Sequence, residues 1–276
     1  MTSDDPGVLL GFAREAARIA AAELAQRVGR VAVLRAKSSP TDPVTEADEA
    51  AESAVRRFLA SRRPDDAVLG EEGGEDAGVS GLRWVIDPLD GTVNYLYGHP
   101  QWCVSVAVED SEGPLAGVVL DVLRDEEFSA VRFGAPMLNG NEFERPDRQP
   151  VGDDPLAGVL LATGFDYEAS VRERQARVLA GLIPRVRDIR RGGSAALDLC
   201  WAAIGRVDAY AEHGGREWDV AAGGLICLAA GLEVELLPTP GWPVGIAAGD
   251  AAVVAELAEA FSCGGPGRSW PQMKLG

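Results

Sequence analysis

An apolar run is followed, within six residues, by two carboxylates, a glycine and a hydroxyl. The stretch reads Trp84-Val85-Ile86-Asp87-Pro88-Leu89-Asp90-Gly91-Thr92-Val93-Asn94-Tyr95. Its first residues predict a buried strand, and the proline ends that strand at a sharp turn. Carboxylates at the end of a strand can hold a hard cation, because such metals bind several converging oxygens. An acidic surface turn is the alternative, and this stretch alone does not decide between the two.

Three further acidic residues lie at the predicted ends of other elements. Glu71 follows a short strand predicted for residues 67–69, in a glycine-containing loop that would equally suit a solvated acid. Asp219 begins a helix predicted for about residues 218–230, and on spacing alone a helix cap is the favoured interpretation. Asp48 lies in the first turn of another predicted helix, where the helix macrodipole favours a carboxylate without any function.

Two glycine-hydroxyl pairs could face an anion. Gly91-Thr92 opens a turn or helix, and Gly193-Ser194 precedes a predicted helix, so both offer backbone N–H groups and a hydroxyl. Neither pair is specific alone. The basic cluster at residues 185–191 is expected to be solvated or paired with acids, although Arg190 or Arg191 could approach a phosphate or a subunit interface.

The spacing of these residues disfavours two other hydrolytic chemistries. Phosphatases of the haloacid dehalogenase class carry D-x-D-G-T with a nucleophilic first Asp, whereas this chain has one more residue between Asp87 and Asp90. In an extended segment, residues two apart point the same way and residues three apart do not, so different carboxylates would face the site. A Ser-His-Asp arrangement is not visible, and the only histidines, His99 and His213, are interpreted as loop residues with satisfied hydrogen bonds.

The charge balance limits the kind of partner. The 276 residues carry a net charge of −17, and the 26 Lys and Arg residues form no dense run, which argues against nucleic acid or an anionic membrane as the main partner. An acidic protein that binds a phosphate needs a positive group, and bound metal would supply it.

Without a basic n-region or a long apolar run, we expect a cytoplasmic protein without a signal peptide or membrane span. The widely spaced cysteines fit buried free thiols in a reducing compartment: Cys103, Cys200, Cys227 and Cys263.

The order of predicted elements suggests two halves, 1–143 and 144–276, joined in the proline-containing segment 144–155. The first half has two helices, from residue 7 to about 30 and from 45 to about 62, separated by a polar connector at 37–43. Strands predicted at 102–108, 115–123 and 127–131 then suggest an antiparallel sheet covered by helices. In the second half, strands alternate with helices, which suggests a layered α/β arrangement. The strands are predicted at 157–163, 187–190, 207–211, 232–237 and 244–247, and the helices at about 168–183, 194–204, 218–230 and 250–261.

With these residues collected, the chain resembles the inositol monophosphatase family, one of the lithium-sensitive magnesium phosphatases that also include fructose bisphosphatases. The resemblance covers nearly the whole chain. It rests on four motifs in order: Asp42-Pro43-Val44-Thr45-Glu46-Ala47-Asp48, Gly70-Glu71-Glu72, the stretch from Trp84 to Tyr95, and Trp218-Asp219-Val220-Ala221-Ala222-Gly223.

The resemblance implies a layered α-β-α-β-α sandwich, usually a homodimer, that binds two or three Mg²⁺ ions. The implied metal ligands are the carboxylates of Glu71, Asp87, Asp90 and Asp219 and the carbonyl of Leu89. The implied catalytic residues are Glu71 and Thr92, which would orient the attacking water, and Asp48, which would act near the metals through water. The implied substrate-binding residues are Asp90, Gly91, Thr92, Gly193, Ser194, Ala195, Glu212 and Asp219.

The implied activity is Mg²⁺-dependent hydrolysis of a small phosphorylated polyol, with myo-inositol monophosphate as the first expectation. Two segments depart from the family pattern: Arg216-Glu217 lies directly before Trp218, and residues 123–127 lack the usual Asn-Pro pair. Histidinol phosphate, adenosine 3′,5′-bisphosphate and fructose 1,6-bisphosphate therefore remain alternative substrates. A regulatory or interaction protein on the same fold is the alternative from another class.

Overall fold

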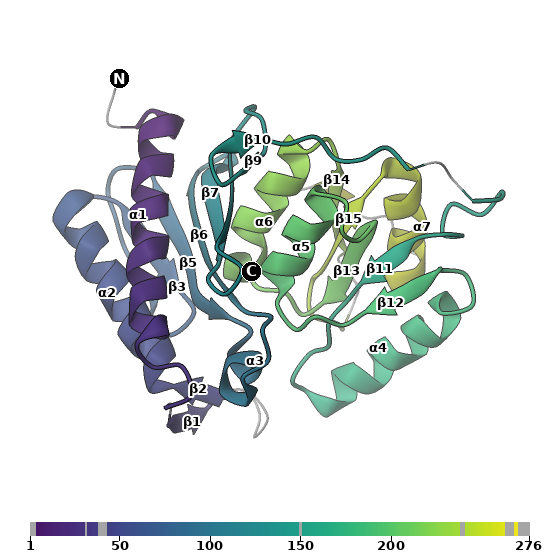
Figure 1. Cartoon of the computed structure of the whole chain (residues 1–276), viewed down its shortest axis with the longest axis horizontal. Coiled ribbons are helices and arrows are strands. Elements are labelled where there is room, and N and C mark those ends of the chain that lie inside the picture. Colours follow the sequence, from purple (N-terminus) through teal and green to yellow (C-terminus); the bar gives the residue numbers. More distant parts are fainter. Residues whose placement is uncertain are drawn as a thin grey trace.

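Helices and two large sheets alternate in layers through the molecule (Figure 1). The computed structural model describes residues 4–30, 32–37, 43–148, 151–237, 241–262 and 268–269. Most of the polar connector, Cys263 and most of the segment from residue 264 lie outside these ranges. The arrangement confirms the α-β-α-β-α sandwich. From one outer face to the other, the helical layers are α1 (Pro6–Ala25) with α2 (Glu46–Arg62), α5 (Ala195–Ala203) with α6 (Glu217–Ala229), and α4 (Ala169–Leu182) with α7 (Ala251–Ser262).

The first sheet brings together strands on either side of the acidic stretch. Its order is β10-β9-β8-β7-β6-β5-β3-β4, and every neighbouring pair is antiparallel except β3 and β5. Because these two strands are parallel and paired in register, their carboxyl ends lie at the same edge of the sheet. The strands are β3 (Ala67–Gly70), β4 (Gly74–Asp76), β5 (Arg83–Asp90), β6 (Cys103–Asp110), β7 (Gly113–Asp121), β8 (Glu126–Val131), β9 (Met137–Leu138) and β10 (Asn141–Glu142).

The second sheet is mixed, with order β12-β11-β13-β15-β14-β16. Strand β11 is parallel to both β12 and β13, and the remaining pairs are antiparallel. Its strands are β11 (Leu160–Ala162), β12 (Asp188–Arg190), β13 (Ala209–His213), β14 (Glu233–Leu237), β15 (Gly245–Gly249) and β16 (Arg268–Ser269). A small separate ribbon pairs β1 (Val33–Ala36) with β2 (Pro43–Thr45).

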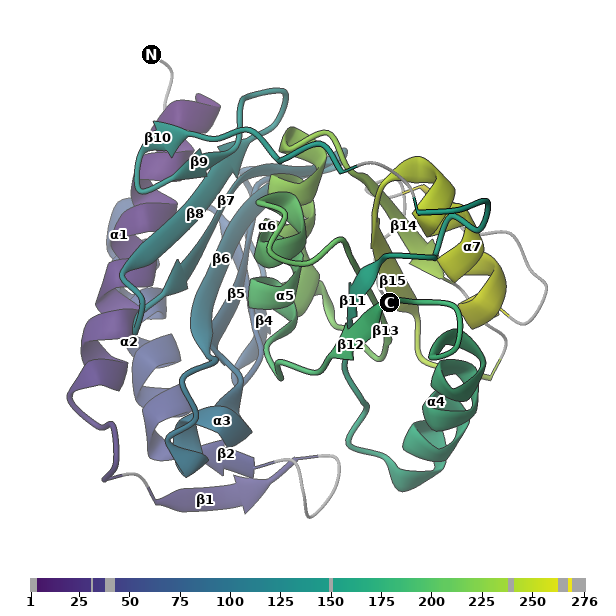
Figure 2. The ribbon, with the colours of Figure 1, turned by 45° about the vertical axis from the view of Figure 1, so that its right-hand side comes forward.

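Helices α5 and α6 are packed between the two sheets (Figure 2). One hydrophobic cluster joins Val85 and Val119 of the first sheet to Tyr210 and Ile246 of the second through these helices. The approach is close: a Cβ on Gly117 of β7 would lie 2.9 Å from the Cα of Ala222. Burial on both sides explains why both helices are apolar around most of their circumference.

The sequence left several short elements open or unpredicted. Helix α3 (Thr92–Tyr97) is the helix of the two alternatives, turn or helix, left open after Gly91; it has only six residues and ends at Gly98, whose φ of 69° is left-handed. This length is too short to show helical periodicity. Strands β1 and β4 are exposed along their length and lack an apolar alternation. Conversely, α1 ends at Ala25, before the predicted residue 30.

Three of the cysteines, Cys103, Cys200 and Cys227, are buried free thiols, as expected. Among the described residues, no helix combines the length and apolar character that a membrane span requires.

His213 lies on strand β13 rather than in a loop, and its ring is fully buried. It packs against Trp242 and Phe261, with ring centroids 4.5 and 5.2 Å away. Burial lowers the pKa of His213 from 6.5 to about 4, because the charged imidazolium would lose its hydration. The unfolded chain therefore binds a proton at this residue at a higher pH than the folded protein does, and stability falls as the pH drops from 6.5 toward 4.

We predict that His213→Phe flattens this pH dependence. Between pH 7 and pH 5 the imidazole would account for a loss of about 2 kcal/mol of unfolding free energy in the wild type. Urea unfolding at both pH values, in EDTA, measures the difference. If the variant loses as much stability as the wild type over this interval, His213 is not the group responsible.

Candidate active site

Three aspartates from distant parts of the chain form one acidic cluster. Oxygens of Asp87, Asp90 and Asp219 all lie within 4.8 Å of one another. The first two side chains are buried and the third is half-buried. Because all the donors are carboxylate oxygens, the set fits a hard divalent cation such as Mg²⁺ rather than a soft metal.

An irregularity in β5 brings Asp87 and Asp90 to the same side. The pairing of β5 with β6 shifts register between these two residues. Such a bulge re-aims side chains that a regular strand would send to opposite faces. Asp87 then accepts the backbone N–H of Leu89 at 2.9 Å. Directly afterwards Gly91, with φ of 100°, turns the chain into helix α3.

Asp219 lies in the first turn of α6. It is the third residue of this helix, and it accepts the backbone N–H of Arg216 at 2.6 Å. It therefore helps to close the helix N-terminus while its carboxylate meets Asp87 and Asp90. Asp219 is therefore not the N-cap residue that the spacing favoured; Arg216 is the N-cap, and Asp219 reaches back to it from the third helical position.

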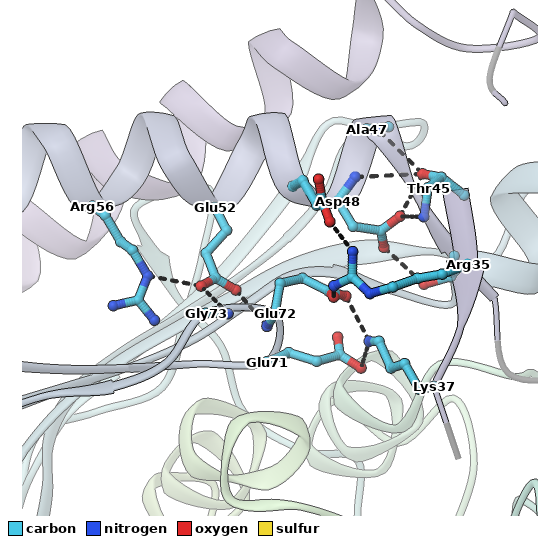
Figure 3. Close-up of polar contacts among 12 residues, drawn as sticks. Arg35, Lys37, Thr45, Ala47, Asp48, Glu52, Arg56, Glu71, Glu72 and Gly73 are labelled. Atoms are coloured by element: carbon cyan, nitrogen blue, oxygen red, sulfur yellow. Dashed lines mark hydrogen bonds and ion pairs between the residues drawn. The ribbon is translucent and has the colours of Figure 1, made fainter. Parts of the chain in front are cut away.

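Glu71 lines the same pocket from the end of β3, but it is not among the three acids whose oxygens lie within 4.8 Å of one another. Its backbone N–H donates to the carbonyl of Ile86 on β5 at 3.3 Å. The Nζ of Lys37 lies 2.6 Å from the Glu71 carboxylate and 2.5 Å from that of Glu72 (Figure 3). Burial raises the pKa of Glu71 to about 7, and the ion pair with Lys37 opposes this shift.

The same physical cause acts on the aspartates. Burial raises the pKa of Asp87, Asp90 and Asp219, and repulsion from the neighbouring acids raises those of Asp87 and Asp219 further. Hydrogen bonds from Ser194 and Ala196 oppose the shift at Asp90. Four acids that repel one another in one pocket favour a bound cation, because it would relieve their repulsion.

Thr92 and Asp48 form a pair next to the cluster. The Thr92 hydroxyl lies 3.0 Å from Asp48 Oδ1 and 3.2 Å from the carbonyl of Leu89, and it can donate to either. Asp48 is fully buried, and its carboxylate also accepts the backbone N–H of Thr45, the residue that caps α2. Burial raises the pKa of Asp48, and these hydrogen bonds oppose the shift. Asp48 thus touches the site through Thr92.

The start of helix α5 adds a second set of donors. The Ser194 hydroxyl and the backbone N–H of Ala196 both donate to Asp90 Oδ2 at 2.7 Å. Gly193 has a left-handed φ of 93°, and a Cβ there would lie 2.5 Å from Arg191 and 2.8 Å from Asn94. Only glycine fits this turn, which places the helix N-terminus beside the acidic cluster.

Glu212 lies on β13 and is close enough to Asp90 to be affected by its charge. Its carboxylate accepts a hydrogen bond from the Tyr210 hydroxyl at 2.8 Å. A Cβ on Gly164 would overlap this carboxylate, so the glycine makes room for it. Burial raises the pKa of Glu212 to about 7, and Tyr210 and Arg191 oppose the shift.

One pocket of about 430 Å³ gathers these groups. Every residue predicted for the site except Asp48 lines it: Glu71, Asp87, Leu89, Asp90, Gly91, Thr92, Gly193, Ser194, Ala195, Glu212 and Asp219.

The pocket also contains charged residues that the sequence analysis did not assign to the site. Lys37, Asp166 and Asp198 line it, as do Arg191 and Arg216. The sequence alone places Lys37 in a polar connector and offers Arg191 as a neighbour of a phosphate or of a subunit interface. Asp198 is buried within an apolar helix, and that placement is the one signal that could have drawn attention to it.

Comparison with known proteins shows one family over nearly the whole chain. The model of the inositol monophosphatase family matches residues 5–260. The chain belongs to this family.

The similarity extends over most of each related protein. The chain is 49% identical over 213 residues to inositol-1-monophosphatase SuhB of Mycobacterium tuberculosis, which covers 75% of this chain and 72% of that protein. It is 41% identical over 219 residues to Nus factor SuhB of Xylella fastidiosa, with 79% and 78% covered. The solved structure of extragenic suppressor protein SuhB from Bartonella henselae has a TM-score of 0.81 and 31% identity, covering 93% of this chain and 99% of that one.

We predict that Asp87→Asn uncouples the stability of the protein from divalent cations. The asparagine can still accept the Leu89 N–H, while one repelling charge is removed, so the variant should be at least as stable as the wild type in EDTA. At a Mg²⁺ concentration of one hundred times Kd, the wild type should gain about 2.7 kcal/mol and the variant much less. Thermal unfolding with and without Mg²⁺ measures both effects. An equal gain in the two proteins would contradict a cation site at this cluster.

Proposed function

We propose that the protein is a Mg²⁺-dependent phosphomonoesterase that hydrolyses a small phosphorylated polyol, with myo-inositol monophosphate as the preferred substrate. The observation that carries this proposal is the convergence of four acids, a helix N-terminus and a hydroxyl in one pocket. The proposal includes two or three Mg²⁺ ions held by Glu71, Asp87, Asp90, Asp219 and the Leu89 carbonyl. It also includes lithium sensitivity and a homodimer.

In this proposal, some residues of the chain bind the phosphate and others orient the attacking water. When bound, Mg²⁺ would neutralise the phosphate, acidify the attacking water and stabilise the leaving alkoxide. Glu71 and Thr92 orient that water. Asp48 holds Thr92 in place by accepting a hydrogen bond from its hydroxyl. Backbone N–H groups at Gly91 and Thr92 hold phosphate oxygens. No side chain attacks the phosphorus.

The additional acids in the pocket support a polyol over a bisphosphate. Asp166, Asp198 and Glu212 line it together with Arg191 and Arg216, and the charge of Arg191 acts on Asp198 and Glu212. Carboxylates accept hydrogen bonds from hydroxyls but repel a second phosphate. This arrangement disfavours fructose 1,6-bisphosphate and adenosine 3′,5′-bisphosphate. Histidinol phosphate remains the alternative, because its ammonium group would also suit these acids.

A substrate panel with Mg²⁺, with and without Li⁺, tests the proposal. Inositol 1-phosphate, histidinol phosphate and the two bisphosphates are compared at equal concentration. The highest kcat/KM is expected for inositol 1-phosphate, with inhibition by Li⁺. Failure to hydrolyse any of the four would overturn the proposal.

A role outside catalysis is the second candidate, and the relative named Nus factor SuhB favours it. The chain would then serve as a Nus factor as well as, or instead of, a phosphatase. Deletion of the gene followed by complementation with Asp90→Asn separates the two. Full rescue by a variant without phosphatase activity would assign the phenotype to the second role.

We predict that Asp90→Asn abolishes Mg²⁺-dependent turnover. The substitution removes a ligand charge. The asparagine carbonyl can keep the Ser194 and Ala196 hydrogen bonds, which leaves its NH₂ group, a donor and not a metal ligand, in place of the other carboxylate oxygen, so turnover should fall by at least about 100-fold. Steady-state kinetics measures the loss, and circular dichroism checks the fold. Turnover near that of the wild type would contradict the metal assignment.

We also predict that the KM for inositol 1-phosphate falls as the pH rises through about 7, the pKa of Glu212. Above this pH the carboxylate is ionised and accepts substrate hydroxyls more strongly. Glu212→Gln should remove this step. An aryl phosphate, which lacks the polyol hydroxyls, is the control substrate. Ionisation of its phosphate changes the KM of wild type and variant equally, so no difference between the two proteins is expected with it. The same pH step in wild type and variant would show that Glu212 does not contact the substrate.

A further inference from the structure

The turn that carries Glu71 is held by a buried carboxylate outside the pocket. Glu52 projects from α2 toward the turn between β3 and β4 and is 2% exposed (Figure 3). One of its oxygens accepts the backbone N–H of Glu72 and the other that of Gly73, each at 2.8 Å. Both oxygens are therefore engaged by adjacent peptide groups of one turn.

Two glycines make room for this carboxylate. A Cβ on Gly70 would lie 2.5 Å from the Glu52 carboxyl group, and one on Gly73 would lie 2.7 Å from it. Neither glycine has a left-handed φ, so the backbone conformation does not demand glycine at these positions. The lack of a side chain is explained by the approach of Glu52.

Arg56, one helical turn further along α2, fixes the carboxylate in place. Its Nε lies 2.7 Å from Glu52 Oε1, and its other nitrogens donate to the carbonyl of Gly74 at 2.6 Å and to Asp76 at 2.7 Å. The helix thus contacts the turn and the following strand β4 through one arginine-carboxylate pair.

These contacts act on Glu71 through its two peptide bonds. On the amino side, the N–H of Glu71 donates to Ile86 of β5. On the carboxyl side, the N–H of Glu72 belongs to the peptide bond that follows Glu71, and Glu52 holds it. With both peptide planes fixed, the Cα–Cβ direction of Glu71 is fixed as well.

We propose that Glu52 is a positioning residue that aims the Glu71 carboxylate at the Asp87–Asp90–Asp219 cluster. The inference rests on the proposed function, in which Glu71 is a metal ligand. Partners that orient ligands change metal affinity by about 10- to 100-fold when removed.

Glu52→Gln tests the inference with almost no change of shape. Only one of its two terminal atoms can accept a hydrogen bond, so its NH₂ group must face either Glu72 N–H or Gly73 N–H. We predict that this variant binds Mn²⁺ about 10- to 100-fold more weakly than the wild type, measured by electron paramagnetic resonance. The probe is the metal alone, so the readout does not depend on turnover.

Asp66→Asn is the matched control. Asp66 is also a buried carboxylate paired with an arginine at 2.7 Å, namely Arg63, but it precedes β3 at the end opposite Glu71. Both variants should lose unfolding free energy in EDTA, whereas only Glu52→Gln should lose Mn²⁺ affinity. Gly73→Ala, whose Cβ would displace the Glu52 carboxylate without changing any charge, is a second test and should also weaken Mn²⁺ binding.

The outcomes separate the inference from the proposed function. If the wild type binds Mn²⁺ and both Glu52→Gln and Gly73→Ala bind it within twofold of the wild type, the inference fails alone. An equal loss of affinity in Asp66→Asn would also overturn it, because stability rather than position would then govern the site. A wild type that binds no Mn²⁺ would overturn both.

Discussion

The repulsion among four buried or half-buried acids is the constraint on which the rest of this structure depends. Carboxylates at such short separations raise one another's pKa and oppose folding unless charge, hydrogen bonds or a cation compensates. The chain supplies part of the compensation itself. Asp90 receives two hydrogen bonds from the start of α5, and Glu71 is paired with Lys37. The remaining imbalance favours a hard divalent cation in this pocket.

The positions of these acids follow from how the strands are paired. The parallel pairing of β3 with β5 brings Glu71 to the edge where Asp87 emerges, within a sheet whose other neighbours are antiparallel. The bulge in β5 then adds Asp90, and the first turn of α6 adds Asp219. Each carboxylate comes from the end of an element, where a side chain can be redirected without breaking the ladder behind it. The rigid sheet thus fixes a geometry that four separate loops would hold less firmly.

Local patterns in the sequence were enough to predict much of this arrangement. The strand before Asp87 and the helix after Asp219 could be located because apolar runs and flanking breakers extend over enough residues. The convergence of Asp87 with Asp90 could not be derived from spacing, since it depends on a bulge set by pairing with β6. Lys37 and Gly164 were missed for a related reason. Their significance comes from partners 34 and 48 positions away in the chain, Glu71 and Glu212, and only the folded structure brings those partners together.

The placement of α5 and α6 between the sheets has a consequence for motion. A two-lobed enzyme can open its cleft by hinge bending when few contacts cross between the lobes. Here both sheets share one hydrophobic cluster through these helices, with backbones in direct contact at Gly117 and Ala222. Hinge bending between the two sheets would break the contacts of this cluster. Access to the pocket is therefore left to surface loops and side chains, and the geometry of the pocket depends on the packing of both sheets against α5 and α6.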